Sequence, residues 1–266
     1  MIIIWIIVCL TVLYIIFETC WVRTTWHRPP APSRFKATVV HLTDIHGRTL
    51  FLNGSISRKV NRLNPDHIII TGDLASRKGQ FKRVLKEIGK LQVPRITFVP
   101  GNYEREGWNG FRKKRYTEQE YQDILQSLQD MNVTVLVNRA CKILHQPDGG
   151  LIYGFDNSIY GNELLTISPA ELEKQDYIIM LAHSPSIIKL LQENNVLYDL
   201  LLTGHTHGGQ IRLRDHTIGA YKHFHTGIKN VDKRRRFYIN RGLGTVKIPV
   251  RLGCPPEIAV FTIGQE

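Results

Sequence analysis

The sequence predicts a layered α/β domain preceded by one apolar N-terminal helix. Three observations lead to this fold class. Apolar, β-branched runs alternate with segments of helical periodicity, which is typical of sheets covered by helices. Acidic, amide or histidine side chains follow directly after five of these runs. An almost uninterrupted apolar stretch occupies the first part of the chain.

The composition is that of a globular protein. The chain has 266 residues, of which 42% are hydrophobic and 22% are charged. A chain of this length can bury a full core, so we expect one large domain. The formal net charge of +12 favours an anionic partner, although solubility accounts for it equally well. Four cysteines argue against a disulfide scaffold; free thiols are favoured, and a Cys141–Cys254 bridge stays open.

The apolar stretch is predicted to be a membrane anchor over residues 1–22. Extended to Val22, it approaches the ~20 residues that span a bilayer. A cleaved signal peptide is disfavoured, because no basic residue precedes the stretch and residues 20–22 are a poor cleavage site. Basic residues follow the stretch, so the positive-inside rule places the following domain in the cytoplasm, on a single-pass anchor in the cell membrane. Residues 23–36 are basic and proline-rich and are predicted to form a stiff linker.

The remaining residues, 37–266, are predicted to form the folded domain. Strands are predicted from apolar runs that end at turn residues, over 38–43, 67–71, 95–99, 133–137, 141–144, 151–154, 177–182 and 198–203. Helices are predicted from periodicity, over 55–63, 80–90 and 117–131. Thr117 is the expected N-cap of the last of these helices. Residues 237–240 and 258–263 are predicted to be late strands of a second sheet.

The clusters that follow the strands consist of metal-binding residue types. In chain order they are Asp44 and His46, then Asp73, Asn102, His183, and finally His205 with His207. Ligands at strand ends converge on one rim of an open sheet. Oxygen and imidazole ligands suit a divalent ion of the Mn, Fe or Zn type rather than a soft thiolate site. Because these ligands exceed what one ion needs, we predict two divalent ions, with Asp73 as the bridge.

Each cluster taken alone also has a purely structural interpretation. Asp44 is a possible helix cap, and Asp73 and Asn102 are common turn residues. A lone histidine is more often a surface residue than a ligand. The glycines at 204, 208 and 209, however, let the backbone bend closely around a bound group. The shared position of the clusters at strand ends favours the metal site.

The order of the clusters resembles the signature of the calcineurin-like metallophosphoesterase superfamily, which is D-x-H, G-D, G-N-H-[DE], H and G-H-x-H. The corresponding segments here are Asp44-Ile-His46, Gly72-Asp73, Gly101-Asn102-Tyr103-Glu104, His183 and Gly204-His205-Thr-His207. The resemblance covers roughly residues 39–210. Residues 238–257 are similar to the bacterial branch of membrane- or wall-associated phosphodiesterases. The resemblance implies a two-sheet β-sandwich flanked by helices.

The resemblance also implies a ligand set and an activity. One ion would be held by Asp44, His46, Asp73 and His207, and the other by Asp73, Asn102, His183 and His205. The implied protein is a membrane-anchored phosphoesterase in which a metal-bridging hydroxide attacks a phosphodiester or phosphomonoester, with the diester favoured. Lipid or cell-envelope phosphates are the expected substrates. Asp73, Asn102 and Tyr103 are the candidate catalytic residues.

Tyr103 is the one departure from the superfamily signature. The superfamily usually has histidine at this position, where it contacts the phosphate. A phenol, with a pKa near ~10, donates a proton less readily than an imidazolium. Loss of a general acid typically costs about 10²–10⁴-fold in rate. A weakly active metal- and phosphate-binding protein is therefore an alternative to an efficient enzyme.

Basic residues cluster at 77–78, 112–115 and 233–236. Beside a membrane anchor, each lysine or arginine adds up to about 1 kcal/mol of attraction to an anionic leaflet. We therefore expect a phosphate-ester substrate and an anionic membrane surface as partners. A metal-dependent nuclease or nucleotide phosphodiesterase is the alternative enzyme, but the chain lacks the aromatic–basic interleaving of a nucleic-acid motif. The sequence gives no indication of the oligomeric state.

Overall fold

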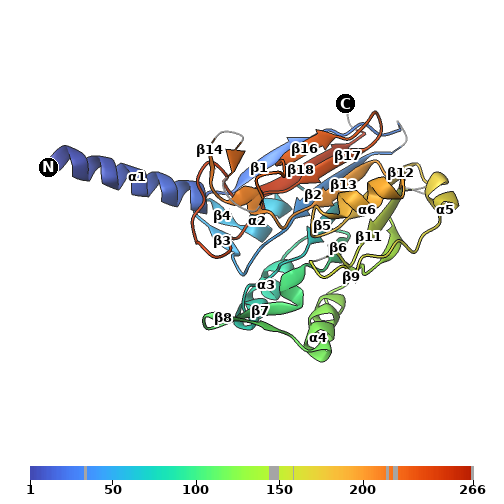
Figure 1. The fold of residues 1–266 in the computed structure, drawn as a ribbon, viewed down its shortest axis with the longest axis horizontal. Coiled ribbons are helices and arrows are strands. Elements are labelled where there is room, and N and C mark those ends of the chain that lie inside the picture. Colours follow the sequence, from blue (N-terminus) through green and yellow to red (C-terminus); the bar gives the residue numbers. More distant parts are fainter. Residues whose placement is uncertain (33–34, 144–149, 158, 214–215, 218–220, 265–266) are drawn as a thin grey trace.

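The computed structural model describes residues 1–32, 35–143, 150–157, 159–213, 216–217 and 221–264. Within these residues, two six-stranded sheets stack face to face, and helices cover both outer faces (Figure 1). This layered arrangement confirms the predicted mixed α/β fold with sheets flanked by helices. Positions 33, 34 and 144, to which the predicted linker and one predicted strand extend, lie outside the described residues.

The first sheet combines a parallel centre with an antiparallel edge. Its strands, in spatial order, are β1 (Arg23–His27), β18 (Glu257–Ile263), β2 (Ala37–Leu42), β5 (His67–Thr71), β6 (Ile96–Val99) and β9 (Val133–Val135). Strands β2, β5, β6 and β9 are parallel, and β18 is antiparallel to β2. The prediction that β18 belongs to the second sheet is wrong. Val260 packs toward the helices and Phe261 toward the second sheet, so a strand buried on both faces does not reveal its sheet.

The structure also corrects the predicted linker. Its first residues form β1, which pairs in parallel with β18 from Arg23 to His27. The Thr25 hydroxyl donates to Glu257 Oε1 at 2.7 Å, and Val22 is buried in the core. Without β1, the backbone of β18 would be an open sheet edge. The folded domain therefore begins immediately after the apolar helix.

The second sheet has a parallel centre and two antiparallel edges. Its strands, in spatial order, are β10 (Arg139–Lys142), β11 (Gly150–Gly154), β12 (Tyr177–Leu181), β13 (Leu200–Thr203), β17 (Arg236–Ile239) and β16 (Gly227–Asn230). Among the described residues, three two-stranded antiparallel pairs lie outside the two sheets: β3 (Leu50–Phe51) with β4 (Gly54–Ser55), β7 (Glu106–Asn109) with β8 (Arg112–Arg115), and β14 (Arg212–Leu213) with β15 (His216–Thr217). As predicted, β17 belongs to this second sheet.

The helices divide between the two outer faces. The first sheet is covered by α2 (Ile56–Asn61), α3 (Phe81–Ile88) and α4 (Glu118–Gln129), and the second by α5 (Pro169–Glu173) and α6 (Ile187–Glu193). Short 3-10 turns are η1 (Lys78–Gln80), η2 (Asn102–Glu104) and η3 (His207–Gly209). Successive residues of a strand face opposite layers: Val40 packs under the helices, whereas Val39 packs between the sheets. All four cysteines are free.

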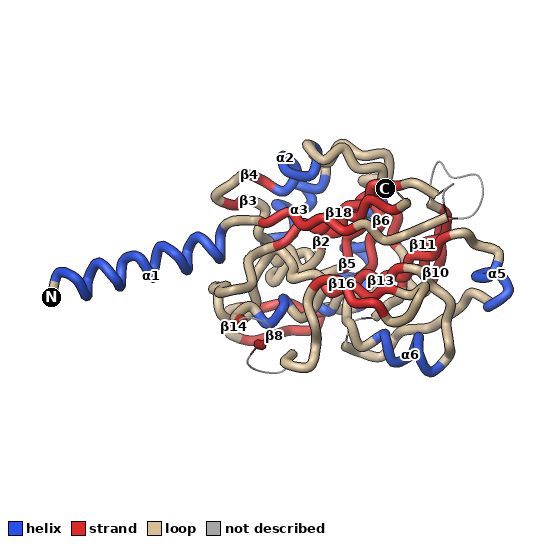
Figure 2. Tube along the Cα trace, turned by 90° about the horizontal axis from the view of Figure 1, so that it is seen from above, coloured by secondary structure: helices blue, strands red, loops and turns tan. Residues whose placement is uncertain are grey.

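The apolar helix α1 (Ile2–Cys20) projects from the domain (Figures 1 and 2). It is long and apolar enough to cross a membrane. Its last turn, in contrast, is buried in the domain: Glu18 and Thr19 are only 3% and 6% exposed. The Thr19 hydroxyl accepts the backbone N–H of Arg251 at 2.9 Å, and the N–H of Leu52 donates to the carbonyl of Cys20 at 2.9 Å. Helix and domain are thus joined without a spacer.

Candidate metal centre

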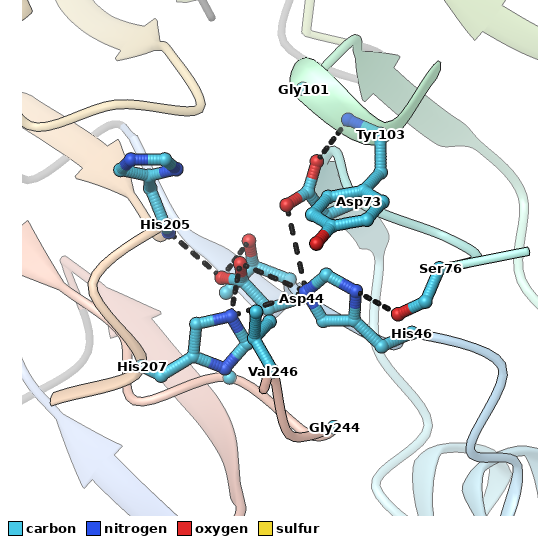
Figure 3. Close-up of polar contacts among 12 residues, drawn as sticks. Asp44, His46, Asp73, Ser76, Gly101, Tyr103, His205, His207, Gly244 and Val246 are labelled. Atoms are coloured by element: carbon cyan, nitrogen blue, oxygen red, sulfur yellow. Dashed lines mark hydrogen bonds and ion pairs between the residues drawn. The ribbon is translucent and has the colours of Figure 1, made fainter. Parts of the chain in front are cut away.

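The predicted ligand residues converge at the carboxyl ends of the parallel strands in both sheets. Asp44 and His46 follow β2, Asp73 follows β5, Asn102 follows β6, His183 follows β12, and His205 and His207 follow β13. They form two groups of potential metal ligands, Asp44 with His46 and His207, and Asp73 with His183 and His205. Within each group the ligand atoms lie within 4.8 Å of one another. Figure 3 shows the side chains of Asp44, His46, Asp73 and His207 pointing toward a common centre.

In the first group, one carboxylate oxygen is left without a hydrogen bond. His207 Nε2 lies 3.2 Å from Asp44 Oδ1 and 3.1 Å from His46 Nε2. The other oxygen, Asp44 Oδ2, accepts from the Thr43 hydroxyl at 2.9 Å and from the backbone N–H of His205 at 2.8 Å. Asp44 Oδ1 is buried and has no hydrogen-bond partner among the described residues. A cation between these groups would satisfy it.

Asp73 lies between the two groups. Its Oδ2 is 3.3 Å from His183 Nε2 on one side and 3.5 Å from His46 Nε2 on the other. His183 Nε2 is in turn 3.0 Å from His205 Nδ1. The other oxygen of Asp73, Oδ1, accepts the backbone N–H of Tyr103 at 2.8 Å, which orients the carboxylate (Figure 3). Oδ2 therefore occupies the position that a bridging ligand requires.

Asn102, directly after β6, offers a further buried oxygen. Its Nδ2 donates to Glu106 Oε1 at 3.1 Å, which fixes the amide so that Oδ1 is free. That Oδ1 is buried and has no hydrogen-bond partner among the described residues. Leaving a buried acceptor unsatisfied costs about 1–3 kcal/mol. Two carboxylates, one amide oxygen and four imidazoles thus fit two divalent cations.

The outer nitrogens of two imidazoles are held by hydrogen bonds. His46 Nδ1 lies 2.8 Å from Ser76 Oγ, and His183 Nδ1 lies 2.7 Å from the carbonyl oxygen of Thr71. These contacts direct each Nε2 toward the centre, as the outer partners of metal-binding histidines do. The sequence analysis missed Ser76 and Thr71, because neither is a metal-ligand type.

Glu104 ties two of the ligand-bearing loops together. Its buried carboxylate accepts the backbone N–H groups of Asp73 at 2.9 Å, Leu74 at 2.9 Å and Gly101 at 2.7 Å. Burial, together with the charge of Asp73, raises the pKa of Glu104. Glu104 belongs to the Gly101-Asn102-Tyr103-Glu104 segment of the family signature, but the sequence alone did not indicate what its carboxylate binds.

Arg251 was missed entirely by the sequence analysis. It is completely buried, and burial lowers its pKa to about 10. Its guanidinium donates to the carbonyls of Gly244 and Arg241 and lies 3.4 Å from His207 Nδ1. Since its backbone N–H also binds Thr19, this one residue joins the end of α1 to a predicted metal ligand. No sequence pattern marks a buried arginine in a loop.

The backbone around the centre adopts strained conformations. Asp44, His46, Asp73, His205 and His207 all have left-handed backbone angles, with φ between 47° and 67°. Such angles are uncommon for residues other than glycine, and they gather at functional sites. This clustering supports a functional centre independently of the side-chain chemistry.

The charges of the centre keep both carboxylates ionised. Burial alone would raise the pKa of each carboxyl, but His207 holds that of Asp44 well below its usual range, and His183 lowers that of Asp73. Burial opposes protonation of His183, yet the Asp73 carboxylate raises its pKa to about 10. Burial and the neighbouring His183 lower the pKa of His205 to about 4. The two ionised carboxylates therefore make the centre favourable for positive charge.

Tyr103 lies against the centre. Its ring packs edge-on against His46, with centroids 4.8 Å apart, and Figure 3 shows it beside Asp73. The phenol oxygen accepts the indole N–H of Trp108 at 3.0 Å. Burial raises the pKa of the phenol, so it stays protonated at neutral pH. Tyr103 thus brings a weak acid to the place where the family signature has histidine.

Comparison with protein families agrees with this arrangement. Residues 37–209 match the profile of the calcineurin-like phosphoesterases. The chain belongs to this family. The match ends at Gly209, two residues after the last predicted ligand, so it contains all seven predicted ligand positions.

Among the chain's relatives, the uncharacterized metallophosphoesterase YkoQ of Bacillus subtilis is 28% identical over 245 residues, covering 87% of this chain and 85% of the relative. The uncharacterized protein YpbG of the same organism is 28% identical over 229 residues, covering 85% and 80%. A transmembrane protein with metallophosphoesterase domain from Bos taurus is 31% identical over 253 residues, covering 87% of this chain and 54% of the relative. A membrane-anchored metallophosphoesterase is consistent with these relatives and with α1.

Proposed function

We propose that this protein is a membrane-anchored, two-metal phosphoester hydrolase that favours phosphodiesters. The observation that carries the proposal is the position of Asp73 Oδ2, within 3.5 Å of an imidazole nitrogen in each ligand group. The oxygens Asp44 Oδ1 and Asn102 Oδ1 support it, because both are buried without a hydrogen-bond partner among the described residues and a cation would satisfy them. Two divalent ions of the Mn, Fe or Zn type would lower the pKa of the water between them and neutralise the phosphoryl oxygens.

Each residue of the centre has a defined part in this proposal. One ion is held by Asp44, His46, Asp73 and His207, and the other by Asp73, Asn102, His183 and His205. Ser76 and Thr71 keep two imidazoles aimed at the ions, and Glu104 fixes the loop that carries Asp73. The Tyr103 phenol donates a hydrogen bond to the phosphate or to the leaving oxygen. The preference for a diester rests on the similarity of residues 238–257 to the bacterial phosphodiesterase branch.

The proposed location is the cell membrane, with the domain on its cytoplasmic face. Helix α1 is the anchor, and the Bos taurus relative is itself described as a transmembrane protein. The orientation rests on the basic residues that follow α1, beginning with Arg23.

The direct test uses the full-length chain in detergent micelles, loaded with Mn²⁺. Hydrolysis of bis(p-nitrophenyl) phosphate and of p-nitrophenyl phosphate is measured side by side in the wild type and in Asp73→Asn. We expect faster turnover of the diester, and a loss of at least about 10³-fold in Asp73→Asn because the bridging charge is removed. Asp130→Asn, at the exposed end of α4, is the matched control and should keep the wild-type rate. Turnover that survives in Asp73→Asn, or a metal-loaded wild type inactive on both esters, would contradict the proposal.

A further inference from the structure

The hairpin of β7 and β8 exposes an aromatic side chain that is followed by a run of basic residues. Phe111, in its turn, is fully exposed at 101% of its reference area. The next four residues, Arg112, Lys113, Lys114 and Arg115, are also exposed. An exposed phenylalanine buries no apolar surface within the domain, so the fold does not account for its presence at this position.

This hairpin lies on the side of the domain from which α1 projects. Figures 1 and 2 both show β8 on that side, together with β14. Four apolar side chains of the surface loops and short strands are each more than half exposed, and we call them the apolar rim: Leu50, Leu52, Leu213 and Ile248. Leu52 joins this rim to the helix, since its backbone N–H donates to the carbonyl of Cys20.

The junction between α1 and the domain determines where these residues lie in a membrane. Glu18 and Thr19 are buried in the domain, and β1 begins at Arg23, so no spacer separates the helix from the fold. If α1 spans the bilayer, the face around its base lies at the headgroups. Apolar side chains gain from partial burial there, and basic side chains gain from anionic lipid.

The hairpin also contacts the metal centre. The Trp108 indole donates to the Tyr103 phenol at 3.0 Å, and the backbone N–H of Trp108 donates to the carbonyl of Ser76 at 2.8 Å. Lys113 Nζ binds Glu106 Oε1 at 2.5 Å, and the same oxygen accepts from Asn102 Nδ2. The strands that carry Phe111 at their turn therefore pack directly against residues of the centre.

We infer that the β7–β8 hairpin and the apolar rim dock onto the anionic leaflet that holds α1, and that the metal centre acts on phosphodiester lipids of that leaflet. Phe111 enters the headgroup region, and the exposed Arg112 and Lys114 bind lipid phosphates. This inference rests on the proposed function and names its substrate class. A soluble nucleotide or nucleic acid as substrate is the competing outcome of the test.

The experiment uses the full-length chain reconstituted in vesicles of phosphatidylcholine, either alone or with about one lipid in three replaced by phosphatidylglycerol. Phosphatidylglycerol is both anionic and a phosphodiester. The variant Phe111→Ser with Arg112→Ser removes the tip of the hairpin without touching the centre. Its control, Leu164→Ser with Lys233→Ser, removes one exposed apolar and one exposed basic residue elsewhere. We measure hydrolysis of phosphatidylglycerol and of bis(p-nitrophenyl) phosphate, and amide hydrogen exchange over residues 107–115.

We expect the tip variant to lose about tenfold or more of its activity on the lipid and to stay within about twofold of the wild type on the soluble diester, because only the lipid depends on docking. Phosphatidylglycerol should slow exchange in the hairpin of the wild type and of the control, but not of the tip variant. Unchanged exchange on adding the anionic lipid, or equal loss on both substrates, would overturn the inference. A wild type that cleaves the soluble diester or nucleotides but no lipid would overturn it while the proposed function stands. Failure on every ester would overturn the proposed function itself.

Discussion

At the scale of single residues, the centre depends on a glycine, Gly101, whose missing side chain leaves room for two of the predicted ligands. Gly101 precedes Asn102, and a Cβ at this position would lie 2.4 Å from Asp73 Oδ1 and 2.8 Å from His183 Nδ1. The backbone of Gly101 has φ −102°, which any residue can adopt. The need for glycine here is therefore steric and comes from the metal ligands themselves.

Gly101→Ala should weaken metal binding. The added methyl group forces Asp73 away from the position between the two ligand groups, so we expect Mn²⁺ affinity to fall at least about tenfold, or about 1.4 kcal/mol. Calorimetric titration of the two proteins with Mn²⁺ measures this. Gly79→Ala is the control, because nothing lies within 4 Å of a Cβ at that position. Equal affinities for wild type and Gly101→Ala would contradict the geometry described for Asp73.

Tyr103→His should restore a stronger general acid. Burial raises the pKa of the phenol, whereas an imidazolium has an ordinary pKa near ~6.5 and transfers a proton more readily at neutral pH. We expect kcat to rise about tenfold or more on alkyl phosphodiesters, whose leaving groups need protonation, and to change little on nitrophenyl esters. Tyr103→Phe, the control, should raise neither rate. If Tyr103→His hydrolyses alkyl esters no faster than the wild type, the phenol of Tyr103 does not limit the rate, which contradicts this prediction.

The sequence was sufficient to predict that the candidate ligands converge, but not to identify the residues that orient them. Asp44, His46 and the others belong to ligand types and follow recognisable strands, so their convergence could be predicted. Ser76 and Arg251 act through a hydrogen bond or a buried charge that only the fold creates. Their identities carry no local signal, because serine and arginine are ordinary residues of exposed loops.

At the scale of elements, β1 is a strand that the local sequence pattern does not predict. Residues 23–27 contain arginine, two threonines, tryptophan and histidine, and none of them is fully buried. This segment lacks the period-2 apolar alternation of a strand. It becomes a strand because β18 offers an unpaired edge. The residues of β5, in contrast, form an apolar run that ends at Gly72, and the predicted bounds were those of the structure.

Removing β1 should destabilise the domain. We compare a fragment of residues 21–266, which keeps β1 and the buried Val22, with a fragment of residues 37–266. The shorter fragment exposes the edge of β18 and loses Thr25, one of the hydrogen-bond partners of Glu257, so we expect a midpoint of thermal unfolding at least about 10 °C lower, at about 2–4 °C per kcal/mol. Sedimentation should show association through the open edge. Equal midpoints would mean that β1 is peripheral to the fold.

At the scale of the whole molecule, the apolar helix α1 and the candidate metal centre are neighbours. Thr19 binds the backbone of Arg251, and the side chain of Arg251 reaches His207. The sequence predicted an anchor separated from the domain by a linker. The structure instead connects the end of α1 to His207, a predicted metal ligand, through the single residue Arg251. Such an arrangement keeps the centre close to whatever surface α1 enters.

The claim on which this account depends most is that two metal ions share Asp73. Electron paramagnetic resonance of the Mn²⁺-loaded protein, combined with elemental analysis, tests it most directly. We predict two Mn²⁺ per chain with an exchange-coupled signal, because one carboxylate oxygen lies between both ligand groups. In Asp73→Asn the coupling should disappear. One Mn²⁺ per wild-type chain, with the signal of an isolated ion, would contradict the two-metal centre.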